Sequence, residues 1–513
     1  MKRPLAILAA LLVLAAAVLI ALPLKLDSTA TPLPFTVLSA QGDASAAEGL
    51  HLRTAISYGS QLRWDTDYDI GANTWETTHA LSGGSYNNAV YYYYDPPLRT
   101  RENTYLRRYI TLFMQQDGPL MTHLKAAAQQ AADTSDGWYG SGYTELLHLR
   151  DYYDTYPLYL SIDRQDISLQ ANTDPTYTDR CPVFDKLRIP VGEADWMEPT
   201  LYRYSGDDWF LGGDVTLHTD NSFTPFSLAL GDNGVLTTVG FAAGASPQED
   251  WAPEGFGLWY IPIVEKTYSS RAGGSVSVSV PDMTQLRLIC PLDIAKQRVV
   301  GLQFTYDRSD ILLTTVEDGR YVLRVLDAAD FRCKLTLPVS ENAQPYHASA
   351  TVGTQSGTVY EEERDGYAMP VYNSSEELLV ACIGPQLTVL RPDGDGWAVD
   401  FTCDLLWPDY DDNGQVAWSS EAFPLNDGDY YYYDGSWSFG LNSQLDAVSM
   451  CYRDGKLAFS TGDSSGEYTL AAVYDRTGLL YTALLDTGLA SQGMYISTFG
   501  FFNPMYFPQL NRA

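Results

Sequence analysis

"LDAVSMCYRDGKLAFSTGDSSGEYTLAAVYDRTGLLYTALLDTG", residues 445–488, is the stretch that predicts the fold class of this chain. It contains four short segments rich in apolar, β-branched and aromatic residues, separated by Asp, Gly, Ser and Thr. Segments of this length, bounded by such residues, are typical of strands joined by hairpin turns. The stretch therefore predicts four consecutive antiparallel strands.

Two upstream segments repeat the pattern. They are "VVGLQFTYDRSDILLTTVEDGRYVLRVLDAADFRCKLTLPV", residues 299–339, and "DGYAMPVYNSSEELLVACIGPQLTVLRPDGDGWAVDFTCDLLWP", residues 365–408. Aligning the fourth strands as "FRCKLTL", "FTCDLLW" and "LLYTALL" places Cys333 and Cys403 at the same position. A recurring four-stranded unit of about 40 to 44 residues is typical of a propeller blade, because blades packed around an axis leave only short, protected sheet edges.

The segment "VYDRTGLLY", Val473 to Tyr481, resembles the strand, turn and strand of quinoprotein-like and WD40-like β-propellers. The resemblance covers roughly the last 200 residues and implies a fold without an activity. With less regular strands upstream, we expect an all-β protein, a β-propeller of about six or seven four-stranded blades over residues 50–513. Inserts are expected at 119–142, where "THLKAAAQQAAD" predicts a helix, and at 340–364 and 409–444. Ring closure is expected to pair "MYISTFGFF" near the end of the chain with "LHLRTAISY" near its start.

The N-terminus predicts membrane attachment. Lys2 and Arg3 precede "PLAILAALLVLAAAVLIALPL", residues 4–24, which carries no charged side chain. About 20 apolar residues suffice to span a bilayer as a helix, and a positive flank stays in the cytoplasm. Residues 1–25 are therefore predicted to be a transmembrane signal anchor and 26–49 a tether, with the rest of the chain outside the cytoplasm. Cleavage near "STA", residues 28–30, would instead give a secreted protein.

The negative net charge limits the classes of binding partner that this chain is expected to have. The chain has 32 Lys and Arg against 64 Asp and Glu, a formal net charge of −32. This charge repels phosphate backbones, so no nucleic-acid partner is expected. We expect an extracellular protein or a glycan as the partner, with the membrane contacted through the N-terminal helix.

The acidic motif "DYDDNG" predicts a calcium site. Asp409, Asp411 and Asn413 fall at positions one, three and five of an EF-type loop, Gly414 at the turn position, and Glu421 one residue beyond the usual twelfth position. A solvated acidic turn is the alternative.

A weaker version of the same pattern occurs in "DTDYDIGANTWE". It offers Asp65, Asp67, Asp69 and Glu76, with Ile70 in place of the turn glycine. Calcium is the only cofactor that these patterns suggest.

Other chemistry-bearing residues match no catalytic motif. Six cysteines are spread without a C-x-x-C pair, which argues against zinc and leaves both disulfides and buried free thiols open. "GDSSG", residues 462–466, has the form of a nucleophile motif, but it falls between two expected strands with no His after His347, so we interpret it as a hairpin turn.

Two tyrosine runs recur as "YYYYD". Tyr91 to Tyr94 fall where a blade strand is expected, so they are predicted to be core residues. Tyr430 to Tyr433 fall in the insert after the second repeat, where we expect a hairpin with "QVAWSSEAF", residues 415–423. Successive strand residues face opposite ways. Tyr430 and Tyr432, with Trp437, are therefore the predicted ligand-contact surface.

The leading functional hypothesis is a membrane-anchored extracytoplasmic β-propeller that acts as a binding or scaffold module. Catalytic residues cannot be chosen from the sequence, and enzymatic activity stays open. One alternative is a propeller-fold glycoside hydrolase or polysaccharide lyase, which would use two facing carboxylates. Another is a calcium-stabilised structural protein.

Overall fold

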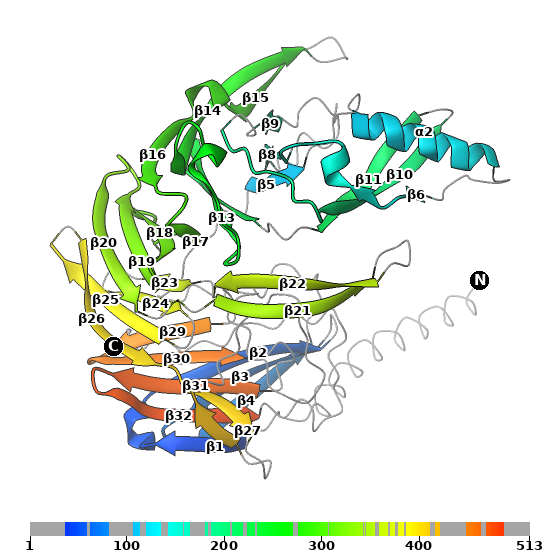
Figure 1. Ribbon diagram of the computed structural model, residues 1–513. Coiled ribbons are helices and arrows are strands. Elements are labelled where there is room, and N and C mark those ends of the chain that lie inside the picture. Colours follow the sequence, from blue (N-terminus) through cyan, green and yellow to red (C-terminus); the bar gives the residue numbers. More distant parts are fainter. Residues whose placement is uncertain are drawn as a thin grey trace, which may run out of the picture. The chain divides into compact units, whose positions relative to one another are not determined.

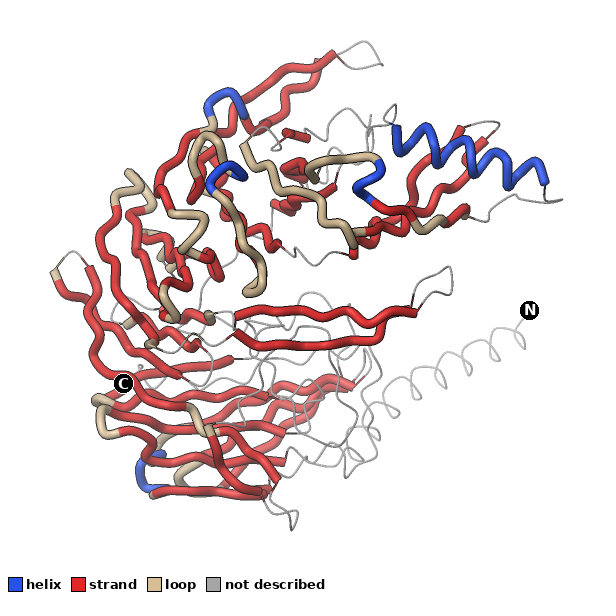
Figure 2. The backbone as a smooth tube through the Cα atoms, viewed as in Figure 1, coloured by secondary structure: helices blue, strands red, loops and turns tan. Residues whose placement is uncertain are grey.

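The computed structural model is built almost entirely of antiparallel β-sheets, which confirms the all-β prediction (Figure 2). The structure describes residues 36–58, 62–81, 106–112, 119–134, 142–156, 158–164, 180–182, 186–205, 208–218, 223–230, 233–269, 275–305, 307–341, 343, 345–353, 359–367, 370–374, 378–383, 386–394, 396–410, 416–420, 448–462 and 468–486. The chain divides into two compact units, one formed by residues 101–370 and the other by residues 1–100 with 371–513.

The first repeat, in the unit 101–370, is a four-stranded sheet with strand order β17-β18-β19-β20. Its strands are β17 (Arg298–Phe304), β18 (Asp310–Glu317), β19 (Arg320–Asp327) and β20 (Cys333–Ser340). The β18–β19 turn is tight because Asp318 and Gly319 both take positive φ, 48° and 77°, the conformation that two-residue hairpins favour. This sheet is the predicted blade.

A second sheet of the same unit, within residues 223–292, is one of the less regular strand groups expected upstream of the three repeats. Its strands are β12 (Phe223–Ala229), β13 (Gly234–Phe241), β14 (Phe256–Ser269), β15 (Ser275–Pro281) and β16 (Arg287–Leu292). The N-terminal half of β14 pairs with β16, and its C-terminal half continues into a hairpin with β15. The four-stranded core of this sheet is thus β12-β13-β14-β16, with β15 as an addition.

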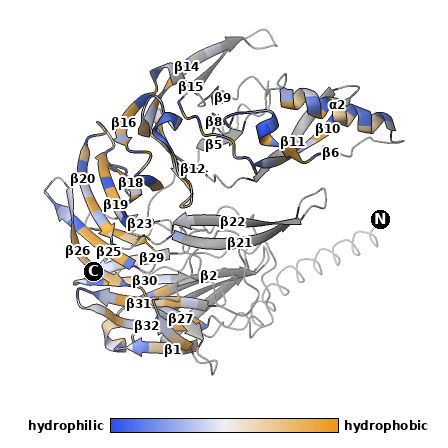
Figure 3. Cartoon of the chain, viewed as in Figure 1, coloured by the Kyte–Doolittle hydropathy of each residue, from blue (hydrophilic) through white to orange (hydrophobic). Residues whose placement is uncertain are grey.

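The rest of this unit is less regular. It contains β5 (Leu106–Leu112), α2 (Pro119–Thr134), β6 (Tyr143–Thr144), β7 (Leu147–His148), η3 (Leu149–Asp151), β8 (Leu158–Arg164), β9 (Arg180–Pro182), β10 (Trp196–Ser205), β11 (Asp208–His218), η6 (Glu249–Trp251), η7 (Met283–Gln285), β21 (Pro345–Gly353) and β22 (Val359–Tyr367). Helix α2 is the predicted helical insert; one of its faces is apolar (Figure 3), and Leu120, Leu124 and Ala128 on it are fully buried. The segment "DKLRIPVG", expected as a strand, forms only an isolated bridge between Thr155 and Pro190.

In the other unit, the second repeat forms the sheet β23-β24-β25-β26. Its strands are β23 (Val371–Ser374), β24 (Leu379–Ile383), β25 (Gln386–Asp393) and β26 (Gly396–Asp404). The predicted equivalence of Cys333 and Cys403 is wrong. Cys403 pairs with Leu387 near the start of β25, whereas Cys333 pairs with Leu326 near the end of β19. The reason is that the tight turn after β25 starts the fourth strand early.

The third repeat has an extra strand (Figure 1). The strands β29 (Val448–Arg453), β30 (Lys456–Gly462), β31 (Tyr468–Asp475) and β32 (Gly478–Asp486) form the predicted blade, and β1 (Thr36–Gly42) pairs antiparallel with β32. Residues 36–42 of the expected tether are therefore a strand, and η1 (Ala44–Ala47) follows it. At the start of this unit, β2 (His51–Tyr58) pairs with β3 (Leu62–Asp69), and "MYISTFGFF", the expected closing strand, lies outside the described residues.

Both faces of the β29–β32 sheet are buried, which follows from its alternating sequence. On one face, Leu457, Phe459, Leu470, Ala472, Tyr474 and Leu484 pack in a core with residues of β24–β27. On the other face, Ala458, Ala471, Val473, Tyr481, Ala483 and Leu485 pack with residues of β2, β3 and the turn before β2. Each fully buried large side chain contributes about 1.5 to 3 kcal/mol. The N-terminal sheet, completed by β4 (Thr74–Leu81), thus packs against the last sheet of the chain.

The motif that carries the propeller resemblance, "DRTG", connects two sheets of this unit. Asp475 Oδ1 accepts hydrogen bonds from Thr477 N at 2.7 Å and Thr477 Oγ1 at 2.5 Å, which lower the pKa of this carboxyl. Arg476 then donates to Asp400 on β26, whose other oxygen accepts from Arg391 Nε at 2.9 Å. The turn therefore positions an arginine that links the β29–β32 sheet to the β23–β26 sheet.

No helix among the described residues is long and apolar enough to cross a membrane. The predicted anchor, residues 1–25, lies outside the described residues.

Candidate functional site

The residues predicted to bind ligand lie mostly outside the described part of the chain. This applies to Tyr430, Tyr432 and Trp437, and to Asp411, Asn413 and Glu421 of the predicted calcium loop. Asp409 lies in β27 (Trp407–Tyr410), which forms a hairpin with β28 (Val416–Ser419). The expected hairpin between residues 415–423 and the tyrosine run stays a prediction, because residues 430–433 lie outside the described residues.

The second candidate calcium loop is a β-hairpin, so the prediction of an EF-type loop there is wrong. Asp65, Asp67 and Asp69 lie in β3, and Glu76 lies opposite Asp67 in β4. Alternate residues of a strand are spread along one face at about 6.5 Å intervals, whereas calcium needs oxygens that converge. Asp67 instead pairs with His51, whose Nδ1 lies 2.8 Å from its Oδ1. Over the described residues, no group of three or more His, Cys, Asp or Glu side chains could hold a metal ion.

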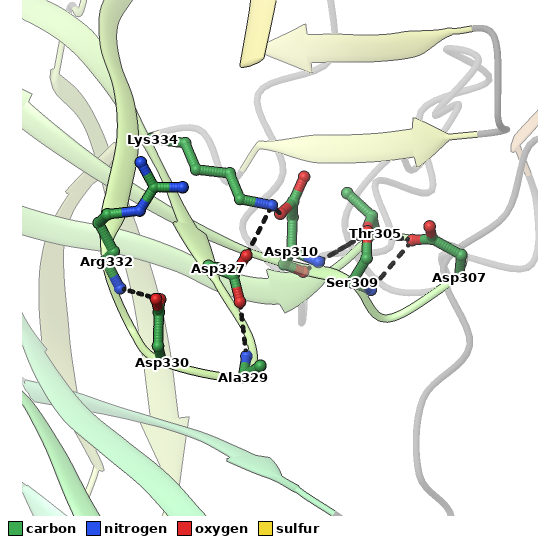
Figure 4. A network of polar contacts seen from close by, with 9 residues as sticks. All are labelled: Thr305, Asp307, Ser309, Asp310, Asp327, Ala329, Asp330, Arg332 and Lys334. Carbon is green, nitrogen blue, oxygen red and sulfur yellow. Dashed lines mark hydrogen bonds and ion pairs between the residues drawn. The ribbon is translucent and has the colours of Figure 1, made fainter. Parts of the chain in front are cut away.

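The best-defined polar site lies at one end of the β17–β20 sheet (Figure 4). There the turn between β17 and β18 is held by Asp307, whose Oδ1 accepts from Thr305 Oγ1 at 2.8 Å, Ser309 Oγ at 2.9 Å and Ser309 N at 3.0 Å. These bonds outweigh the effect of burial and lower the pKa of the Asp307 carboxyl. The turn is thereby closed on itself.

Lys334 joins this turn to the β19–β20 loop. Its Nζ lies 2.5 Å from Asp310 Oδ1 and 3.0 Å from Asp327 Oδ2, pointing between the two carboxylates (Figure 4). The Lys334 side chain is 15% exposed and that of Asp310 is 8% exposed. A charge so far removed from water persists only when it is paired. The ammonium therefore neutralises two adjacent carboxylates and links the two loops.

The β19–β20 loop, residues 327–332, uses its own backbone donors internally. Ala329 N donates to Asp327 Oδ1 at 2.8 Å, and Arg332 N donates to Asp330 Oδ1 at 2.9 Å. Phe331 N donates to Asp327 O at 2.9 Å, and Asp327 N donates to Arg332 O at 2.9 Å. The Ala329 N–H and the Lys334 ammonium lower the pKa of the Asp327 carboxyl. The loop is a closed, rigid structure.

This rigidity holds an aromatic side chain in a strained position. Phe331 has φ 64°, a left-handed conformation that costs a bulky residue roughly 1 to 3 kcal/mol. Its half-buried ring lies 5.1 Å from that of Tyr260, at 43° between planes. The guanidinium of Arg287, an exposed residue opposite Tyr260 in the β14–β16 pair, lies 4.9 Å from the Tyr260 ring centre and 5.6 Å from that of Phe331. We call Tyr260, Arg287 and Phe331 the aromatic–arginine cluster.

The aromatic–arginine cluster has no recognisable signature in the sequence. "DAADF" marks a turn, yet nothing in it requires a positive φ at the phenylalanine. The cluster also combines residues of two sheets, and a sequence without an alignment does not show which sheets adjoin. The Asp and Ser of "YDRSD" were the available signal, because such residues cap turns.

A second group of titratable side chains lies beside helix α2. His123 Nε2 lies 3.1 Å from Glu145 Oε1, and Tyr143 donates its hydroxyl hydrogen to Glu145 Oε2 at 2.8 Å. Burial raises the pKa of Tyr143 to about 12, and the contact with Glu145 adds to this effect. Tyr152, 5.9 Å from the His123 ring, also has a raised pKa because of burial. These contacts attach α2 to the neighbouring strands.

The thiols are free where they are described. Cys290, Cys333, Cys382 and Cys403 form no disulfide, and among them only Cys333 is exposed. Burial raises the pKa of Cys382 and raises that of Cys403 to about 12, so neither thiol is reactive at neutral pH. The "GDSSG" segment lies between the antiparallel strands β30 and β31, as the hairpin interpretation requires.

Comparisons with known proteins assign no family. No protein-family model and no curated protein matches the chain. Among solved structures, the chain resembles TolB from Acinetobacter baumannii at 9% identity and a TM-score of 0.17, covering 89% of this chain and 82% of that one. A protein from Lactobacillus plantarum matches at 9% identity and a TM-score of 0.23, covering 90% and 99%. Oligopeptidase B from Trypanosoma brucei, with covalently bound antipain, matches at 10% identity and 0.16, covering 78% and 62%. TM-scores this low assign neither a fold nor a function.

Proposed function

We propose that this chain is a membrane-anchored, extracytoplasmic β-propeller that serves as a binding or scaffold module. The apolar run at residues 4–24, preceded by Lys2 and Arg3, supports the anchor. The observation that supports the ring is the position of the N-terminal sheet: β2 and β3 pack on the β29–β32 sheet, and β1 extends that same sheet. A ring of blades needs its first and last blades to meet in this way.

The carboxylates at the end of the β17–β20 sheet favour a binding role over catalysis, because they are already engaged in structural contacts. The carboxylates of Asp307, Asp310 and Asp327 all hold loops or neutralise Lys334. Rigid loops on a scaffold are suited to present contact residues, because little conformational entropy is lost on binding. The aromatic–arginine cluster is the group that these loops present.

Location is tested with Cys333, the exposed thiol on β20. Intact cells expressing the full chain are treated with a membrane-impermeant maleimide. We expect labelling that falls in a Cys333→Ser variant and does not rise when the cells are permeabilised. The already buried Cys382 supplies the matched control, because Cys382→Ser should leave labelling unchanged. Labelling of Cys333 only after lysis would contradict an extracytoplasmic location.

The binding role is tested against the glycan-cleaving alternative. Membranes containing the full chain are incubated with a panel of polysaccharides, and new reducing ends and unsaturated ends are measured. A binding module releases neither. Product formation that one Asp→Asn or Glu→Gln substitution abolishes would replace the binding role by that of a hydrolase or lyase.

A further inference from the structure

We propose that the aromatic–arginine cluster is a binding site for a glycan residue that carries a carboxylate, a uronic acid. The inference rests on the proposed binding role and names the class of its ligand. Three observations carry it: an exposed arginine that has no carboxylate partner among the described residues, two aromatic rings beside it, and a strained phenylalanine that the loop holds in place.

The first step concerns charge. The chain has twice as many acidic as basic residues, and several arginines of the sheets are paired with carboxylates, such as Arg320 with Glu341 and Arg324 with Glu317. Arg287 is exposed, and within the described residues its contacts are with the Tyr260 and Phe331 rings rather than with a carboxylate. Stacking orients a guanidinium through its face and leaves its N–H groups available at the edge. That edge matches a carboxylate in a two-pronged hydrogen bond.

The second step concerns strain. Glycine would take the φ of 64° at position 331 without cost, yet a phenylalanine occupies it. The surrounding hydrogen bonds and the Lys334 link hold the conformation. Strain of this kind, in a loop that over-determines it, points to a role for the side chain in contact with a ligand.

The third step selects a sugar over a peptide. The backbone N–H groups of residues 327, 328, 329, 331 and 332 are already engaged within the sheet end, so these groups are not offered to a peptide terminus, which is typically captured by several such donors. Aromatic rings instead provide a face for the C–H groups of a pyranose. The guanidinium lies within 5.6 Å of both ring centres, close enough for one sugar residue to touch ring and charge together.

The fourth step limits the number of charges on the ligand. A net charge of −32 repels a polyanion at long range. A polyuronate is therefore disfavoured. The site fits a single uronic acid within an otherwise neutral glycan.

The test measures binding of two disaccharides to the full chain in detergent micelles by calorimetry. One contains glucuronic acid linked to galactose; the other has glucose in place of glucuronic acid, so that only the carboxylate differs. We expect the acidic sugar to bind about tenfold or more tightly than the neutral one. Arg287→Gln should remove this preference, and Arg287→Lys should restore only part of it, because Lys lacks the planar fork.

Phe331→Gly separates binding from folding. It removes the strain together with the ring, so we expect weaker binding of the acidic disaccharide with an unchanged or higher melting temperature. Arg320→Gln, which removes an exposed positive charge at the opposite end of the same sheet, is the matched control and should change affinity by less than about twofold.

Several outcomes would overturn the proposal. One is that the acidic disaccharide shows no saturable binding although Cys333 is labelled from outside the cell. This result would overturn the uronic-acid site but not the general binding role. Others are equal binding of both sugars, or an affinity that Arg287→Gln does not change. Tighter binding of a peptide with a free C-terminal carboxylate than of its amide, lost in Arg287→Gln, would assign the site to peptides instead. A lower melting temperature in Phe331→Gly with full binding would make the phenylalanine purely structural.

Discussion

The β17–β20 and β29–β32 sheets share one strand order and differ at the fourth strand. In the first sheet, β20 is an edge strand with mostly exposed or half-buried residues. In the second, β32 has five consecutive buried residues, because β1 covers its free edge and the N-terminal sheet covers one of its faces. By pairing with β32, the N-terminal strand β1 thus converts an edge strand into an interior strand of the sheet.

The two sheets also differ in how polar groups are satisfied. The β17–β20 sheet pairs its charges: Lys334 pairs with carboxylates at one end of the sheet, and Arg324, in the middle of β19, pairs with Glu317. In the β29–β32 sheet, Ser460, Thr469 and Thr482 are fully buried and, within the described residues, their hydroxyls have no hydrogen-bond partner. The last sheet is therefore stabilised by burial and by the pairing of β1 with β32, whereas the first is stabilised by paired charges.

The largest effect is expected from breaking the β1–β32 junction. A methyl group at Gly42 would lie 2.2 Å from Leu480 O, and Gly42 has φ +92°. We expect Gly42→Ala to lower the free energy of unfolding by about 4 kcal/mol. Hydrogen exchange should quicken in peptides that cover β32 and stay slow in those that cover β20.

Gly49 provides the control for this prediction. It also has a positive φ, +71°, but no atom lies within 4 Å of an added methyl group. Gly49→Ala should cost only about 1 kcal/mol, the conformational part of the effect. Equal losses in the two variants would show that β1 is not held by close packing on β32.

A somewhat smaller effect is expected at the charged end of the β17–β20 sheet. Lys334→Met leaves Asp310 and Asp327 without their shared cation, at a cost of about 3 kcal/mol. The hydrogen bond from Ala329 N–H and the contact with Lys334 lower the pKa of Asp327 in the folded protein. Stability from this carboxyl is therefore present above the unfolded pKa and lost as pH falls through the folded pKa.

This pH dependence gives the measurement for the Lys334 variant. Thermal unfolding is followed from pH 7 into the acid range, and the wild-type loss below about pH 4 should be smaller in Lys334→Met. Lys334→Met with Asp310→Asn should recover part of the stability, because one of the two uncompensated charges is removed. If the loss of stability in acid were unchanged in the variant, Lys334 would not be lowering the pKa of Asp327.

A smaller effect is expected from calcium at the β27–β28 hairpin, whose Trp418 Nε1 donates to Ser39 Oγ of β1 at 3.1 Å. If Asp409, Asp411 and Asn413 bind calcium, saturating calcium should stabilise the hairpin and the β1 edge by about 1 to 3 kcal/mol. We predict that a chelator lowers the melting temperature and that Asp411→Ala removes this response. If the chelator did not change the melting temperature, the calcium-stabilised alternative would be excluded.

Local features of both sheets could be predicted from the sequence, and non-local ones could not. The Asp-Gly pairs Asp318-Gly319 and Asp454-Gly455 predict two-residue hairpin turns, because Asp and Gly tolerate the positive φ that both positions of such a turn require. The pairing of β1 with β32 joins residues more than 400 apart, and no local pattern encodes it. The register of β26 was missed because turn length, rather than residue type, sets where a fourth strand begins.

The candidate site shows the same division. The capping role of Asp307 follows from its position in a turn, which the sequence displays. The environment of Arg287 depends on which loop of a neighbouring sheet reaches it, and the strain at Phe331 depends on hydrogen bonds that close that loop. The predicted contact residues Tyr430, Tyr432 and Trp437 lie outside the described residues, so their role stays a prediction.

The smallest effect is expected from the unpaired hydroxyls in the β29–β32 sheet. Thr482 is fully buried, and its hydroxyl has no partner in the described residues, so Thr482→Val keeps the shape and removes a desolvated polar group. We expect this variant to gain about 1 kcal/mol in the free energy of unfolding.

In the other sheet, the buried Thr315 hydroxyl accepts from Arg324 at 2.7 Å and donates to Glu317 at 2.5 Å, so Thr315→Val should lose stability instead. Urea unfolding of the two variants, measured side by side, therefore asks whether one substitution has opposite signs in two sheets of the same topology. Equal signs would mean that the sheets do not differ in how their buried hydroxyls are satisfied.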